Sequence, residues 1–217
     1  MRRILQGVMI ANAPMLCWSC RGPTPAGLFC ATCRTILPPV AGEDLFGLFD
    51  IAPTFEPDLT ILEKRYRDLQ KQLHPDFFAH CSGTERRLSL EWTTRINEAW
   101  QTMSDPVTRA GYLLRLAGWH AERPAVDPEF LEEVMELREA LEEVDPRAPD
   151  AISRLMSLKT AARIRLEFEI TRIGELFRGN GDSSLGEIAK HVDRMRYHRR
   201  YLEELDRLED RAFDPDM

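Results

Sequence analysis

Residues 58–76 read DLTILEKRYRDLQKQLHPD, a stretch in which apolar side chains recur every three or four positions. On an ideal helix these apolar positions fall within about 80° of one another, which predicts one face packed against a core. The stripe consists of Leu59, Leu62, Tyr66, Leu69 and Leu73. Three basic residues occupy the opposite, solvent-facing side of the same helix: Lys64, Arg67 and Lys71.

The predicted helix ends at the triplet His74-Pro75-Asp76. Because Pro75 disfavours helical backbone at the residue before it, the chain should leave the helix sharply and expose His74 and Asp76 at the tip of a helical hairpin. His74 and Asp76 make a poor acid–base pair, because a rigid proline separates them and no nucleophile is nearby. A contact surface is therefore favoured over catalysis. A plain helix stop beside a solvated basic face remains the alternative.

Helical patterns continue through most of the chain. They predict a short piece at 44–49, helices over about 84–103, 128–143, 151–178 and 183–209, and one that begins at Asp105-Pro106. Asp followed by Pro, found at 105–106 and 127–128, is a helix start signal because Asp caps the free N–H groups and Pro fits the first turn. No strand pattern or repeat is found, so the predicted fold class is all-α behind a small N-terminal metal knuckle.

Four of the five cysteines form two Cys-x-x-Cys pairs: Cys17, Cys20, Cys30 and Cys33. Two intervening residues let both thiolates of a pair face one tetrahedral ion, which predicts a single structural zinc ion. Four thiolates leave no open coordination position, so the site should serve folding or docking. A redox dithiol is the alternative, and Cys81 is expected to be an ordinary free thiol.

Composition narrows the function classes. The 217 residues are 43% apolar and 30% charged, typical of a globular protein, and no apolar run approaches the roughly 20 residues of a membrane helix. Residues 1–42 hold four Arg and no acidic residue, which leaves 25 basic and 36 acidic residues downstream. The net negative charge of the chain beyond residue 42 argues against general binding to nucleic-acid phosphates. Paired cysteines favour a reducing compartment, with the bacterial cytoplasm slightly favoured over the mitochondrial matrix.

The hairpin with its triplet resembles a J-domain. More narrowly, four segments resemble the HscB family of J-domain co-chaperones of iron–sulfur cluster assembly: YRDLQKQLHPDFF, NEAWQTM, RAGYLL and FLEEVMELREALEEV. The tetracysteine module is similar to that of longer family members. The resemblance implies an N-terminal extension at 1–16, a tetracysteine zinc module at 17–40, a J-domain at 44–119 and a C-terminal three-helix bundle at 127–210. Phe77 departs from the basic residue usual after the triplet.

The resemblance implies two protein partners. His74, Pro75 and Asp76, with the basic stripe, would contact a DnaK-type (HscA-like) ATPase chaperone and stimulate its ATP hydrolysis, so the chain itself is not an enzyme. The C-terminal bundle would capture the iron–sulfur scaffold protein (IscU-like) for cluster assembly and transfer. The candidate scaffold-binding residues are Leu131, Met135, Glu136, Glu139, Glu143 and Tyr197.

The helical pattern at 128–143 supports this second surface. Leu131 and Met135 fall outside the stripe expected to pack, beside acidic residues, and an apolar centre with a charged rim is typical of a partner site. Tyr197 falls opposite the packing stripe of the last helix and is also expected to be exposed. A wide core face that buries Leu131 and Met135 remains possible on this pattern. Glu132 and Tyr197 stand where the family commonly has an apolar residue and Phe.

Other functional classes stay open at this stage. A nucleic-acid-associated zinc protein would need basic and aromatic residues near the knuckle, where only Trp18, Arg21 and Arg34 occur. A zinc enzyme is disfavoured by the closed ligand set. A J-domain co-chaperone with a different client, or an interaction protein built on the zinc module, are the remaining alternatives.

Overall fold

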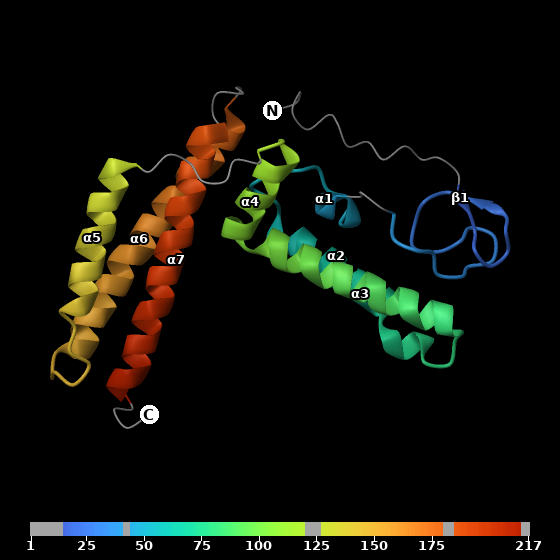
Figure 1. The fold of residues 1–217 in the computed structure, drawn as a ribbon. Helices are drawn as coiled ribbons and strands as arrows, with labels where there is room; N and C mark the ends of the chain where they lie inside the picture. The colour runs from blue at the N-terminus through green and yellow to red at the C-terminus, as the bar shows by residue number, and fades with distance from the viewer. Residues whose placement is uncertain (1–14, 41–43, 120–126, 180–184, 214–217) are drawn as a thin grey trace. The chain divides into compact units, whose positions relative to one another are not determined.

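The computed structural model describes residues 15–40, 44–119, 127–179 and 185–213. The chain divides into two compact units, residues 2–109 and 110–217, and each unit is described by itself. The all-α prediction with a small N-terminal knuckle is confirmed (Figure 1). The N-terminal extension predicted at 1–16 lies almost wholly outside the described residues, and the assignment of 17–40, 44–119 and 127–210 to separate domains stays a prediction. No helix in the described ranges is long and apolar enough to cross a bilayer.

The first unit begins with the tetracysteine module. Two short antiparallel strands, β1 (Met15–Leu16) and β2 (Pro23–Thr24), bring Met15 opposite Thr24, and an isolated bridge joins Phe29 to Ile36. The sequence pattern did not indicate these strands. Two-residue strands are too short to produce an alternating pattern, and here the turns around the cysteines align the backbone.

A helical hairpin forms the rest of this unit. After α1 (Leu45–Leu48), α2 (Leu59–Leu73) is capped by Asp58, whose Oδ1 accepts hydrogen bonds from the N–H groups of Thr60 and Ile61 at 2.9 and 3.1 Å. α3 (Gly83–Ser104) begins at a capping box made by Ser82 and Glu85. These caps satisfy the N–H groups that a helix start leaves unpaired.

The apolar stripe predicted on α2 forms most of the hairpin contact. Leu62 and Leu73 are fully buried, and Tyr66 and Leu69 are half-buried against α3. Leu59 is the exception, because it is the first residue of α2 and its side chain is about half exposed. Residues spaced by three or four along α3 supply the other half of the core: Leu88, Trp92, Ile96, Ala99 and Met103.

A buried arginine follows the hairpin. α4 (Pro106–Leu116) begins at Asp105, whose Oδ2 accepts from the N–H of Thr108 at 3.0 Å. Arg109 donates from Nε to the carbonyl of Phe55 at 2.8 Å and from a terminal nitrogen to the carbonyl of Met103. These two backbone oxygens therefore satisfy N–H donors of the buried guanidinium.

Besides the end of α4, the described part of the second unit holds three antiparallel helices (Figure 1), α5 (Pro128–Glu142), α6 (Ala151–Arg178) and α7 (Leu185–Phe213). Leu137, Leu155, Ala162, Tyr201 and Leu205 are buried together between them. The helix predicted at 151–178 matches α6, whereas α5 ends one residue before the predicted 143 and α7 continues past the predicted 209 to Phe213.

Candidate functional site

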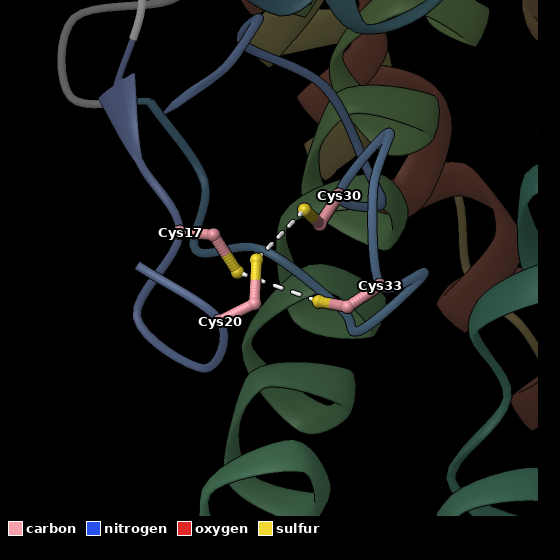
Figure 2. Close-up of side chains that lie close together, drawn as sticks. All are labelled: Cys17, Cys20, Cys30 and Cys33. Atoms are coloured by element: carbon pink, nitrogen blue, oxygen red, sulfur yellow. Dashed lines mark hydrogen bonds between the residues drawn. The ribbon is translucent and has the colours of Figure 1, made fainter. Parts of the chain in front are cut away.

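The four paired cysteines converge on one point (Figure 2). Their Sγ atoms all lie within 4.8 Å of one another, with Cys17 to Cys33 at 3.7 Å and Cys20 to Cys30 at 3.8 Å. A tetrahedron with metal–sulfur bonds of about 2.3 Å has edges of about 3.8 Å. The donor set therefore fits one tetrahedral metal ion, with Cys17 and Cys30 buried and the other two at the surface.

The two cysteine pairs are held by the same local turn. In each pair the residue after the second cysteine, Arg21 or Arg34, has φ of 60° and donates its N–H to the carbonyl of the first cysteine, at 2.9 and 3.0 Å. The N–H of Cys17 then bonds to the carbonyl of Gly22, as that of Cys30 does to Thr35, at 3.0 and 2.9 Å. This repeated left-handed turn wraps the backbone around both thiols of a pair.

The thiols differ in how readily they ionise. A hydrogen bond from the backbone N–H of Cys33 lowers the pKa of the Cys30 thiol to about 6, despite burial. The backbone N–H of Gly22 lowers the pKa of Cys20, but burial and the three neighbouring thiols outweigh it and raise that pKa to about 11. The thiol of Cys30 is thus ionised more readily than that of Cys20, and a bound cation would stabilise all four cysteines as thiolates.

The tip of the hairpin has a defined geometry. Leu73 ends α2, and Pro75–Phe78 form the 3-10 helix η1. The Nδ1 atom of His74 accepts a hydrogen bond from the N–H of Asp76 at 3.3 Å and lies 3.4 Å from the carboxylate of the same residue. The side chains of His74 and Asp76 are 53% and 87% exposed. The predicted exposure of both is confirmed, and Pro75 between them is half-buried.

Two hydroxyl groups of α3 anchor this tip. Ser89 donates to the carbonyl of Leu73 at 2.7 Å, and the hydroxyl of Thr93 lies 3.3 Å from the same oxygen and 2.9 Å from the carbonyl of Ser89. Because Leu73 immediately precedes His74, these bonds fix the point where the chain leaves α2. The side chains of the basic stripe on α2 are exposed, as expected, and Arg67 pairs with Glu63 one turn earlier at 2.5 Å.

The second candidate surface lies on α5. Leu131 and Met135 are 48% and 62% exposed, which rules out the alternative that the core buries them. Exposed carboxylates border them at Glu132, Glu136 and Glu139. At the C-terminal end of α5, Glu143 is also exposed and pairs with Arg154 of α6 at 3.3 Å.

Tyr197 does not stand free, contrary to the expectation. It is half-buried because α5 covers that side of α7, and its hydroxyl donates to the carbonyl of Val134 at 3.3 Å. Its ring meets that of Phe130 edge-on at 5.6 Å and stacks with that of Tyr201 at 6.4 Å. Tyr197 therefore lies at the seam of α5 and α7 instead of on an open face.

Sequence reasoning missed a polar network that fixes α5. Arg194 of α7 bonds to Asp127, the residue before α5, at 2.5 Å and lies over the Phe130 ring at 5.3 Å. The buried carboxylate of Glu169 lies 3.7 Å from Arg194 and pairs with His191. The hydrogen bond from Arg194 holds the pKa of Asp127 below its ordinary range. Charged residues in amphipathic helices look like solvated positions, so no sequence signal separates these from the rest.

Comparison with known proteins places the chain in one family. The family model described as the HSCB C-terminal oligomerisation domain matches residues 126–206. A co-chaperone protein HscB homolog of Paraburkholderia phytofirmans is 36% identical over 150 residues, which cover 68% of this chain and 85% of that protein. An iron-sulfur cluster co-chaperone protein HscB homolog of Arabidopsis thaliana is 34% identical over 191 residues, covering 87% and 72%.

The solved structures give the same result. The crystal structure of human co-chaperone protein HscB matches with a TM-score of 0.80 and 29% identity, over 88% of this chain and 97% of that one. The match to chaperone HscB from Vibrio cholerae has a TM-score of 0.69 and 32% identity, over 78% and 99%. Together with the hairpin tip, the cysteine cluster and the three-helix unit, these similarities show that the chain belongs to the HscB family of co-chaperones.

Proposed function

We propose that the chain works as an adaptor in iron–sulfur cluster assembly, with one surface for a DnaK-type (HscA-like) ATPase chaperone and another for the iron–sulfur scaffold protein (IscU-like). The observation that carries the chaperone contact is the anchored tip, where His74 and Asp76 are exposed beside a carbonyl held by Ser89 and Thr93. A rigid exposed tip loses little freedom on binding, so its contacts contribute fully to the interaction.

The basic stripe supports the same contact. Its three ammonium and guanidinium groups lie on the helix that leads to the tip, where they would guide the chain to an acidic surface and raise the association rate. His74 and Asp76 would then contact the chaperone at short range and favour its hydrolysing state, which requires tighter binding to that state. The ATPase site belongs to the chaperone, and the chain contributes no catalytic group.

The α5 surface supports scaffold capture. Leu131 and Met135 form an exposed apolar pair, and Glu136, Glu139 and Glu143 supply an acidic border. Tyr197 would contribute from the seam of α5 and α7, where its ring and that of Phe130 lie nearly perpendicular. An apolar centre inside a charged rim excludes water from the contact while the rim selects the partner.

We infer that the cysteine cluster holds one structural zinc ion, because four thiolates at tetrahedral spacing are the usual ligand set of such sites. Zinc bound there supplies folding energy and no open coordination position. Unpaired thiols of this kind persist in a reducing compartment, and we infer that the chain works in one, with the bacterial cytoplasm slightly favoured.

ATP turnover by the purified chaperone tests the proposal. His74→Gln removes the imidazole from an exposed position and should leave the fold intact, so it should abolish stimulation without lowering the unfolding midpoint. His80→Gln is the matched control, because His80 is also exposed but lies beyond η1. Full stimulation by the His74 variant would refute the assignment of the tip.

A further inference from the structure

The tetracysteine module is joined to α3 along much of that helix. The indole Nε1–H of Trp92 donates to the carbonyl of Leu37 at 2.7 Å in a buried hydrogen bond. Arg95 donates to the carbonyl of Val40 at 3.1 Å, and Thr35 donates to the capping carboxylate of Glu85 at 3.3 Å. The chain that follows the second cysteine pair is therefore part of the wall of the hairpin.

Ile36 joins the module to the hairpin core through apolar contacts. It is 1% exposed and belongs to one buried cluster with Leu73, Phe78 and residues of α3. Phe29, which directly precedes Cys30, pairs with Ile36 through the isolated bridge and packs against the same cluster. The second cysteine pair thus lies between Phe29 and Ile36, both of which pack against the hairpin core.

Leu73 and Phe78 lie on either side of the segment that carries His74, Pro75 and Asp76. Leu73 is fully buried and Phe78 nearly so, whereas Phe77 between them points outward. Both ends of the exposed tip are therefore fixed in the core to which Ile36 contributes. A void at Ile36 would loosen this core, because interiors relax only partly around a missing side chain.

We infer that metal binding at the four cysteines orders the His74–Asp76 tip, and that Ile36 is the positioning residue that connects the two sites. Cys17 and Cys30 are themselves buried with Leu37, the neighbour of Ile36. Because the binding energy of a structural metal is folding energy, loss of the ion should loosen the second cysteine turn and release Ile36 from the hairpin core. The inference concerns the order of the tip and goes beyond the proposed chaperone contact.

Hydrogen exchange of the full chain tests this directly, without any chaperone. Three amides in and after η1 are hydrogen-bonded and report opening of the tip: Phe77 to His74, Ala79 to Asp76 and Cys81 to Phe78. Exchange is compared between zinc-loaded protein and protein stripped by a chelator under reducing conditions. We expect these amides to exchange about tenfold faster after stripping, a factor that corresponds to the loss of one well-made contact, with α6 unchanged as the internal reference.

Ile36→Ala separates the connection from the metal site itself, because it keeps all four cysteines. The variant should still bind one zinc ion, exchange fast at the tip even when loaded, and respond less than about twofold to stripping. Leu90→Ala is the control on the same helix, since Leu90 is 57% exposed, and it should keep the full response.

Two results would overturn the inference. One is unchanged exchange at the tip of the stripped wild-type chain while the amides of the cysteine turns lose protection. The other is an Ile36→Ala variant that holds zinc and responds to stripping as strongly as the wild type. If that variant fails to hold zinc, the wild-type comparison decides alone. If the tip amides exchange as expected but the protein does not stimulate the chaperone's ATPase, the proposed function is refuted and this inference is not.

Discussion

Replacing Leu131 and Met135 with alanine removes the apolar centre of the α5 surface without disturbing the bundle core. At 48% and 62% exposure the two side chains offer a partner roughly 200 Å² of mostly apolar surface. Two alanines would keep about 80 Å² of this, so about 120 Å² of burial is lost, or about 3 kcal/mol at about 25 cal/mol per Å². That loss corresponds to a roughly 150-fold higher Kd for the scaffold.

Titration calorimetry with purified scaffold protein measures this change. The matched control is Ile164→Ala with Phe168→Ala, a pair on α6 that is 65% and 62% exposed and should leave the affinity unchanged. An increase in Kd of less than about threefold for the α5 variant would refute the assignment of the surface. An equal loss in the α6 control would show that any exposed apolar pair in this unit contributes.

Three further predictions concern the stripe, the bundle and the metal. Alanine at the three basic residues of α2 (Lys64, Arg67 and Lys71) should slow association with the chaperone about tenfold at low salt but hardly at high salt, measured by stopped flow. Burial lowers the pKa of His198, so between the two pKa values His198 is protonated in the unfolded chain and neutral in the folded chain. Stability followed by helix circular dichroism should therefore fall as pH drops below about 6.5, and His198→Phe should flatten this dependence. Cys20→Ser should lower the zinc content measured by elemental analysis below one ion per chain, whereas Cys81→Ser should keep it.

Local rules predicted the elements of the fold because each helix carries its own signals. Asp58 and Asp105 cap the helices that follow them, and Pro75 ends α2 at the expected residue. The spacing of Leu62 and Leu73 predicted the buried face of α2 correctly. The predicted burial of Leu59 was wrong, because periodicity along one helix does not show whether a neighbouring helix covers its first turn.

The candidate site was predictable where exposure follows from one element alone. His74, Asp76, Leu131 and Met135 are exposed because of their place on a single helix or turn. Tyr197 was misplaced because its burial depends on α5, a helix distant in sequence that covers one flank of α7.

Long-range contacts were beyond sequence reasoning for the same reason. The hydrogen bond from Trp92 to Leu37 joins residues 55 positions apart. The pairing of Arg194 with Asp127 joins residues 67 positions apart. Such contacts depend on how whole helices pack against one another. The hydrophobic periodicity of a single helix therefore does not predict them.

The central claim is that one molecule carries both surfaces, and trans-complementation of ATP turnover tests it most directly. The chaperone and scaffold are mixed with wild-type chain, with His74→Gln, with the Leu131→Ala and Met135→Ala double variant, or with both variants together. If a single chain must present the scaffold to the chaperone, the mixture should stay as deficient in scaffold-dependent turnover as the better variant alone. Turnover restored to the wild-type rate by the mixture would contradict the adaptor.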